Sequence, residues 1–233
     1  MTLIERKSMN SNYLCCLDFE TVGQIKPSSD KCQPIQLASC IIHPRRLEIV
    51  AGSEFNCVIC PEDWDIPDDS MNFHMKVTGK SKAELLAKWR EGLPIKQAWS
   101  NFVDYLDKWH KPGVKRKSFF SAALSCGYNN FSYDDIIIQR LATRFGNINS
   151  EGGQNLFYSR DGFDVMKLIS YFFENNNDVT SISLDNMRDY FGLSRENGHD
   201  ALQDVKQTAE LLIRFLKLSR SLQIKFKGAF NVS

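Results

Sequence analysis

Residues 13–19, with the sequence YLCCLDF, are apolar at neighbouring as well as alternate positions. Successive side chains of a strand point to opposite faces, so a run without alternation has to be covered on both sides. This run therefore predicts a central strand of a layered α/β fold with helices on both faces of the sheet. The chain has 233 residues, 42% of them hydrophobic, which is enough material for one such domain.

The other patterns predict a mixed central sheet of about five strands. Two apolar segments, 34–42 and 47–60, favour an antiparallel meander with a hairpin near residues 43–46. Further strands are expected over 118–128 and, as a short strand, over 155–158. A linker is expected over 61–69. Helical periodicity and end signals predict helices over 80–90, 94–109, 133–146, 163–174, 183–193 and 197–216.

Charge and cysteine usage limit the class of protein. The formal net charge is +1, so any contact with nucleic acid has to come from a local patch, and the basic segment 111–117 is either that or a solvated turn. Seven cysteines, an odd number, indicate buried thiols in a reducing compartment, the cytoplasm or nucleus. No apolar run suits a signal peptide or a membrane span, so no membrane partner is expected.

The first candidate for chemistry is the pair Asp18 and Glu20, at the end of the predicted central strand. Alternate residues of a strand share a face, which puts their Cα atoms roughly 6.6 Å apart. Two carboxylates this close raise each other's pKa, and a divalent cation relieves the repulsion. The alternative interpretation is a strand that ends in two solvated acids.

Two later segments add further candidates. Asp134 follows the strand predicted over 118–128 and opens a helix, where a negative charge also suits the helix dipole. Asp204 lies within reach of the apolar stripe of the helix predicted over 197–216, where a carboxylate without a partner costs several kcal/mol or more. His199 stands at the start of that helix and is, by itself, also explained as a surface or capping residue.

Taken together, four carboxylates and one histidine fit a two-metal site for phosphoryl transfer. Such sites hold two cations about 3.5–4 Å apart, which activate a water and stabilise the leaving oxygen. Mg²⁺ and Mn²⁺ are the ions that carboxylate oxygens suit. With a reference pKa near 6.5, His199 can accept the proton of the water at neutral pH.

The three motifs, in this order, resemble those of the DEDDh 3′–5′ exonucleases, which adopt the ribonuclease H-like fold. The matching segments read LDFET (17–21), NNFSYDD (129–135) and GHDALQDVKQT (198–208). In motif details they are most similar to bacterial exonuclease I and to polymerase proofreading subunits. The resemblance covers residues 12–218, which implies an exonuclease domain with an N-terminal extension, 1–11, and a C-terminal tail, 219–233.

The resemblance also implies roles for individual residues. Two Mg²⁺ or Mn²⁺ ions would be held by four acids while a histidine serves as general base, and two polar residues would lie near the terminal nucleotide. The catalytic set is Asp18, Glu20, Asp134, Asp204 and His199, and the substrate-binding pair is Thr21 and Asn130.

The implied activity is that of a hydrolase, a metal-dependent 3′–5′ exonuclease that releases nucleoside 5′-monophosphates. The implied partner is the 3′ end of a nucleic acid, with single-stranded DNA slightly favoured, and protein partners are not indicated. One alternative is an exoribonuclease that trims RNA, since nothing in the motifs separates ribose from deoxyribose. The other is a catalytically silent nucleic-acid-binding domain, whose usual mark, lost ligands, is missing from these motifs.

Overall fold

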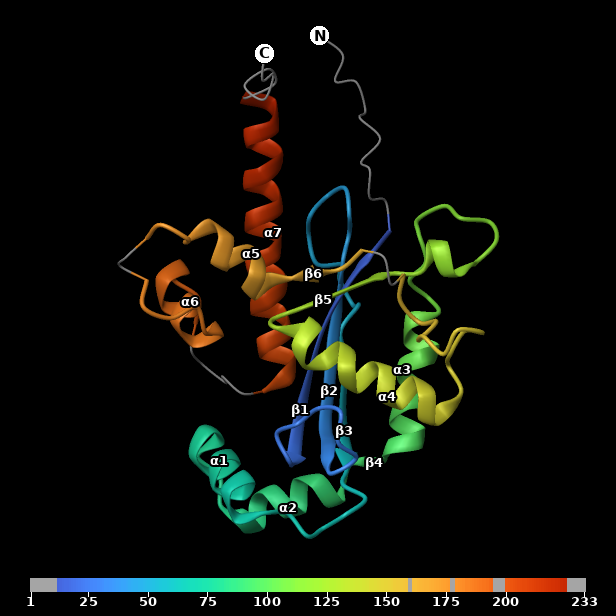
Figure 1. Cartoon of the computed structure of the whole chain (residues 1–233), viewed down its shortest axis with the longest axis vertical. Helices are drawn as coiled ribbons and strands as arrows, with labels where there is room; N and C mark the ends of the chain where they lie inside the picture. The colour runs from blue at the N-terminus through green and yellow to red at the C-terminus, as the bar shows by residue number, and fades with distance from the viewer. Residues whose placement is uncertain (1–11, 159–160, 177–178, 195–199, 226–233) are drawn as a thin grey trace.

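The computed structural model describes residues 12–158, 161–176, 179–194 and 200–225, and within them six strands form one mixed sheet (Figure 1). The strands are β1 Leu14–Gly23, β2 Cys32–Ile42, β3 Phe55–Cys60, β4 Leu93–Pro94, β5 Leu124–Gly127 and β6 Phe163–Asp164. Across the sheet they are ordered β4-β3-β2-β1-β5-β6. β2 is antiparallel to β1 and β3, whereas β5 is parallel to β1 and β6. The predicted mixed sheet is confirmed.

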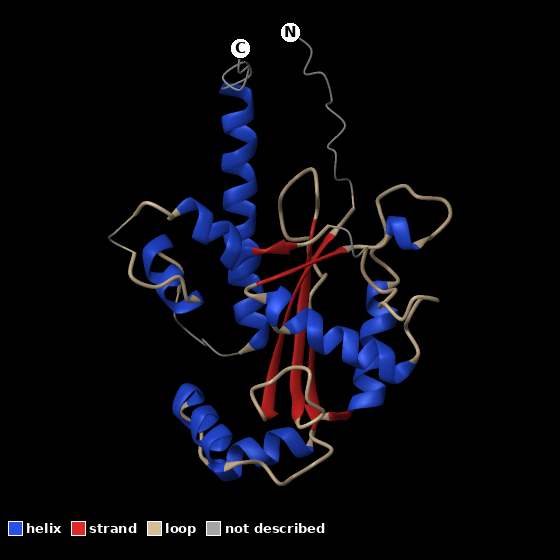
Figure 2. Ribbon diagram, in the orientation of Figure 1, coloured by secondary structure: helices blue, strands red, loops and turns tan. Residues whose placement is uncertain are grey.

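Helices cover both faces of this sheet (Figure 2). α7 runs along one face beside α5 and α6, α3 and α4 lie on the other face, and α1 and α2 lie beyond one end of the sheet (Figure 1). The helices are α1 Asp68–Thr78, α2 Lys82–Arg90, α3 Ile95–Leu106, α4 Asp134–Phe145, α5 Val165–Phe172, α6 Leu184–Phe191 and α7 Ala201–Lys225, with short 3₁₀ helices η1 Phe119–Ser121 and η2 Asn130–Ser132.

The apolar run of β1 is buried on both sides, as its composition predicts. Cys15 and Leu17 belong to a core that includes residues of α3 and α4. Leu14 and Cys16 belong to a second core that includes residues of α5, α6 and α7. β1 is therefore the strand that separates the two cores. Its later residues continue to alternate between the face covered by α3 and α4 and the face covered by α7.

Two helix ends confirm local signals in the sequence. α4 ends at Gly146, which adopts a left-handed φ of 81° that glycine accepts at little cost. α6 begins after Ser183, whose hydroxyl accepts a hydrogen bond from Asn186 N at 3.3 Å. α7 continues to Lys225, past residue 216 where the predicted helix ends and past residue 218 where the C-terminal tail was expected.

The expected linker over 61–69 is wrong at its end, because α1 begins at Asp68. α1 has no apolar stripe to announce it, since only Met71 and His74 are buried. Its end signals are nevertheless present: acidic residues in the first turn and a left-handed Gly79 after the last. A prediction of α1 from the sequence would have had to rely on these end signals alone.

The short strand expected over 155–158 is also wrong, and the strand in this region is β6. The side chain of Gln154 accepts hydrogen bonds from Leu156 N at 2.7 Å and Phe157 N at 2.9 Å, which holds these residues in a turn. The strand expected over 118–128 is shortened for a related reason. Ser118 N donates to Ser121 Oγ at 2.9 Å, which closes η1 before β5 begins.

None of the helices within the described ranges has the length and apolar character that crossing a membrane requires.

Gly127 allows the chain to turn tightly where β5 ends. A Cβ atom at this position would lie 2.8 Å from Asn130 Cβ and 2.9 Å from Leu17 O. These distances are shorter than van der Waals contact, and the carbonyl belongs to the central strand, which cannot move freely. The absence of a side chain thus brings η2, and the start of α4 behind it, close to β1.

Gly127→Ala is therefore expected to lower the free energy of unfolding by about 1–3 kcal/mol, the usual cost of overpacking. Urea denaturation at neutral pH measures the change. Ser132→Ala, at an exposed position of η2, is the control and should stay within about 0.5 kcal/mol of the wild type. Equal stability of the two variants would contradict the proposed close approach.

Candidate active site

Asp18 and Glu20 continue the alternation of β1 on the face covered by α7. They follow Cys16, which belongs to the core beneath that helix. The register of β1 against β2 shifts directly after Glu20, since Glu20 pairs with Gln36 and Thr21 with Pro34. Proline has no N–H to give to a ladder, which suits it to such an irregularity. The two acids therefore stand directly before this irregularity, beyond which β1 continues in the shifted register to Gly23.

α7 brings Asp204 to the same place. Cys16 Sγ donates a hydrogen bond to Val205 O at 3.5 Å, so the first turns of α7 lie directly on β1. Asp204 is 8% exposed, and one oxygen each of Asp18, Glu20 and Asp204 lie within 4.8 Å of one another. We refer to these three residues as the acid cluster. The convergence expected from three separate segments is thus seen for the first and the last of them.

The acid cluster is electrostatically costly. Burial raises the pKa of Asp18 to about 7, with a further contribution from the charge of Asp204. Burial raises the pKa of Glu20 to about 9, and the charges of Asp18 and Asp204 add to the shift. Both shifts indicate carboxylates that lack sufficient positive charge nearby, which is the situation that a bound cation corrects.

Asp134 lies beside the acid cluster but has a bond of its own. It is 2% exposed, and its Oδ1 accepts a hydrogen bond from Phe19 N at 2.9 Å. β5 pairs with β1 only as far as Cys16, so the N–H of Phe19 needs another acceptor. Burial, together with the charge of Asp18, raises the pKa of Asp134 well above its usual range. Asp134 thus interacts electrostatically with the acid cluster, while its Oδ1 accepts the hydrogen bond that Phe19 N cannot donate to β5.

Arg188 is the residue of this region that the sequence patterns do not reveal. Its side chain, on α6, is 1% exposed and donates to Asp204 on α7. It also donates to Asp185 Oδ1 and to Gln207 Oε1. In the sequence Arg188 reads as a polar position of an amphipathic helix, so the only available signal was the demand of Asp204 for a partner.

The predicted substrate-binding residues have different surroundings. Thr21 has its hydroxyl hydrogen-bonded to Tyr133 Oη at 2.6 Å, on the side of the α3 and α4 core. Asn130 is fully buried and donates to Ser125 Oγ at 3.1 Å. As it lies here, Asn130 has no surface for a nucleotide to touch and supports the turn before α4. Asp135, the second acid of this motif, accepts from the same Ser125 hydroxyl at 2.7 Å.

His199, the predicted general base, lies outside the described residues. Asp200, which follows it, is described and caps α7: its Oδ1 accepts from Leu202 N at 3.2 Å. Its Oδ2 accepts from Gln36 Nε2 at 3.3 Å, and Gln36 belongs to β2. The first residue before α7 is thereby tied to the sheet next to the strand that carries Asp18 and Glu20.

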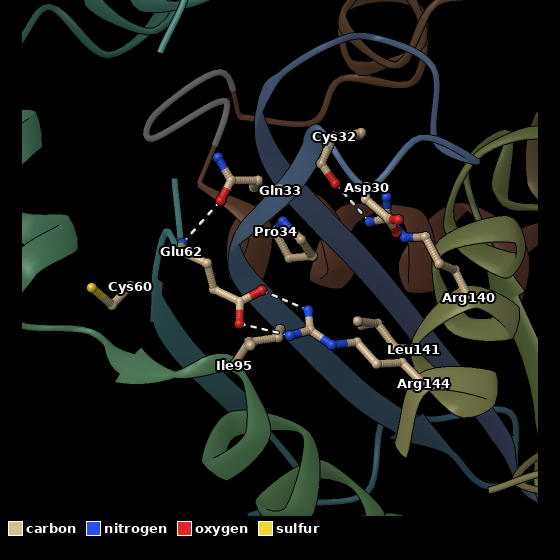
Figure 3. A pocket seen from close by; sticks show the side chains of 10 residues that line it. All are labelled: Asp30, Cys32, Gln33, Pro34, Cys60, Glu62, Ile95, Arg140, Leu141 and Arg144. Atoms are coloured by element: carbon tan, nitrogen blue, oxygen red, sulfur yellow. Dashed lines mark hydrogen bonds and ion pairs between the residues drawn. The ribbon is translucent and has the colours of Figure 1, made fainter. Parts of the chain in front are cut away.

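A separate pocket lies on the opposite face of the sheet, between the start of β2, the end of β3 and α4 (Figure 3). Arg144 crosses it to pair with Glu62 at 2.5 and 2.7 Å, and Arg140 donates to Cys32 O at 2.6 Å. Its cavity of about 30 Å³ has room for roughly one water molecule. The pocket is therefore too small for a nucleotide.

The donor set of the acid cluster fits a hard divalent cation. It offers oxygen atoms from three carboxylates, the ligand type that Mg²⁺ and Mn²⁺ prefer, in a partly buried position where negative charge accumulates. Such a site can hold a cation against a phosphate group and polarise a water molecule.

No protein-family model matches the chain, and no curated protein matches it in sequence. Solved structures do resemble it. Cell-death related nuclease 4 superposes with a TM-score of 0.63 at 14% identity over 89% of this chain and 64% of that protein. Escherichia coli exonuclease I in complex with a dA16 oligonucleotide gives 0.62 at 18% identity over 89% and 42% of the two chains. The nuclease domain of 3′hExo, a DEDDh family member bound to rAMP, gives 0.62 at 16% identity over 90% and 94%.

The chain thus spans 64% of the length of cell-death related nuclease 4 and 42% of exonuclease I. At 14–18% identity the likeness concerns the fold. This chain therefore shares its overall fold with cell-death related nuclease 4, exonuclease I and the nuclease domain of 3′hExo. The expected ribonuclease H-like fold is confirmed.

The raised pKa values predict how stability depends on pH when no metal is bound. Between about pH 4 and pH 9 the folded chain holds more protons on Asp18 and Glu20 than the unfolded chain does, so these groups cost stability as the pH rises. Asp18→Asn removes one charge and should raise the free energy of unfolding at pH 8 by roughly 1–3 kcal/mol in EDTA, with a smaller effect at pH 5.

Urea denaturation at the two pH values measures this difference. Asp104→Asn, at an exposed position of α3 on the other face of the sheet, is the matched control and should change neither value. A variant Asp18→Asn whose advantage does not grow from pH 5 to pH 8 would refute the repulsion within the acid cluster.

Proposed function

We propose that this chain is a metal-dependent 3′–5′ exonuclease, a hydrolase that cleaves phosphodiester bonds and releases nucleoside 5′-monophosphates. The observation that carries the proposal is the convergence of Asp18, Glu20 and Asp204, from β1 and α7, on a fold shared with nucleases. A fold alone does not determine an activity, but here the acids stand on its central strand and on its last helix.

Four acids of this chain are proposed to hold the metal: Asp18, Glu20, Asp204 and, from the start of α4 beside β1, Asp134. Two Mg²⁺ or Mn²⁺ ions, when bound there, would activate the attacking water and stabilise the charge that develops on the leaving oxygen. The choice between Mg²⁺ and Mn²⁺ is left to assay, since both suit carboxylate oxygens.

His199 is proposed to accept the proton of the attacking water on a ring nitrogen. The water oxygen forms a new bond to phosphorus while the bond from phosphorus to the 3′ oxygen breaks. The released nucleotide keeps its 5′ phosphate, and the shortened strand regains a 3′ hydroxyl by taking up a proton. Repetition of this step would remove nucleotides from the 3′ end.

The proposed partner is the 3′ end of a nucleic acid, with single-stranded DNA slightly favoured. Solved structures with this fold include exonuclease I with a DNA oligonucleotide and the nuclease domain of 3′hExo with rAMP, so the fold accommodates either sugar. Digestion of 5′-labelled single- and double-stranded DNA and RNA tests the choice. Faster shortening of RNA would identify the chain as an exoribonuclease, and binding without shortening would indicate a silent domain.

Asp204→Asn and Asp18→Asn are each expected to reduce hydrolysis of the best substrate to background, because each removes a metal-binding charge while keeping the shape of the side chain. Product length on a denaturing gel, with Mg²⁺ or Mn²⁺ against EDTA, is the measurement. Asp104→Asn serves as the control with wild-type turnover. Near-normal turnover of either cluster variant, in folded protein, would remove the acid cluster from the mechanism.

His199→Ala is expected to lower the rate by roughly 10²- to 10⁴-fold, the usual contribution of a general base. The rate should be measured at saturating substrate so that binding does not enter. The loss should shrink as the pH rises, because hydroxide can replace the base. An unchanged rate at pH 7 would mean that another group accepts the proton.

A further inference from the structure

Arg188 places a fixed positive charge against the acid cluster. Its guanidinium lies in the interior at 1% exposure and donates to Asp204, one of the three clustered acids. An arginine stays protonated at any pH at which proteins fold. One position beside the cluster is thus permanently occupied by a cation that belongs to the chain itself.

The surroundings of Arg188 keep this charge in place. Nε donates to Gln207 Oε1 one turn along α7 from Asp204, and Nη1 donates to Asp185 Oδ1 one turn back along α6. Three contacts from a planar group fix its orientation as well as its position. The charge of Arg188 also opposes the upward shift of the pKa of Asp18, so its field extends from α6 to this acid of β1.

We propose that Arg188 is a resident counter-ion of the acid cluster: it stabilises the metal-free fold and, because it shares Asp204, weakens the affinity of the cluster for divalent cations. This inference rests on the proposed metal-dependent function and adds a specific control over it. Arg188 is a positioning residue in this scheme, since it contacts a metal-binding acid and no substrate.

The sign of the effect follows from Coulomb's law. A divalent cation at the cluster carries two charges, so a neighbouring guanidinium repels it, and partial burial makes that repulsion strong. Loss of the guanidinium also favours a competing proton, but a proton carries a single charge and gains half as much. Removal of Arg188 should therefore tighten metal binding, whereas loss of a purely orienting contact would weaken it.

The test compares Mn²⁺ binding by the wild type and by Arg188→Met, without nucleic acid, using isothermal titration and the electron paramagnetic resonance signal of free Mn²⁺. Arg188→Met keeps the unbranched apolar stem of the side chain and removes the guanidinium with its charge. It is expected to bind Mn²⁺ at least ~10-fold more tightly than the wild type. In EDTA its melting temperature should be lower than that of the wild type. Addition of Mn²⁺ should raise this temperature by more than it does for the wild type.

Arg214→Met is the matched control. Arg214 also joins α7 to α6, through a 2.9 Å bond to Phe191 O and an ion pair with Glu210, but it contacts none of the clustered acids. Its Mn²⁺ affinity should stay within about twofold of the wild type. Arg188→Gln, which also removes the charge but keeps a polar amide donor at this buried position, guards against loss of the fold and should also bind Mn²⁺ more tightly.

One contrary result is that the wild type binds Mn²⁺ while folded Arg188→Met and Arg188→Gln bind it equally or more weakly. That result would overturn the role of Arg188 and leave the proposed metal site standing. The same conclusion follows if both neutral variants stay unfolded even with excess Mn²⁺. Absence of Mn²⁺ binding in the wild type and in all variants would instead overturn the proposed metal-dependent function.

Discussion

The packing of α7 against β1 is the contact on which the candidate site depends. Small and branched apolar residues of α7, among them Ala201, Val205 and Ala209, are fully buried in the core they share with β1. Each buried branched side chain contributes roughly 1.5–3 kcal/mol. The same register of helix on strand carries Asp204 to Asp18 and Glu20, so the free energy of apolar packing offsets the repulsion among the acids.

A fold that gathers negative charge needs compensation from within, and two groups among the described residues supply part of it. Arg188 contributes a full charge to Asp204 from the interior, and the backbone N–H of Phe19 contributes a dipole to Asp134. The ion pair of Arg144 with Glu62 has similar chemistry, but both side chains are about half exposed, where water screens the interaction. The buried pair therefore influences the site in a way that the surface pair does not.

Much of this arrangement could be predicted from local pattern. Alternation in β1 assigns Asp18 and Glu20 to one face, and helical periodicity puts Asp204 beside a buried stripe, so their meeting requires only that α7 cover that face. Arg188 could not be predicted in this way. Its burial depends on how α6 meets α7, a contact between residues 16 apart in sequence that no short-range period encodes.

Other differences have the same origin. α1 buries only Met71 and His74, and it is held by contacts with the end of β1, including a 2.8 Å bond between His74 Nε2 and Thr21 O. The place of Asn130 in a motif predicts that it lies near a nucleotide, which stays a prediction, while the structure places its side chain in the interior beside the tight turn at Gly127. In both cases tertiary contacts decide what the local sequence leaves open.

The location of the acids also follows from the topology of the sheet. β1 keeps β2 beside it as far as Gly23 but loses its parallel neighbour β5 after Cys16. Beyond that point one edge of the central strand has backbone N–H groups that do not pair with β5. Asp134 accepts a hydrogen bond from one of them, the N–H of Phe19. The end of a parallel pairing thus calls for an acceptor at the very place where β1 presents Asp18 and Glu20. The unpaired edge of β1 needs a hydrogen-bond acceptor at the place where the strand carries its carboxylates. For this reason β1, the start of α4 and α7, which are far apart in sequence, all supply acids to one position of the fold.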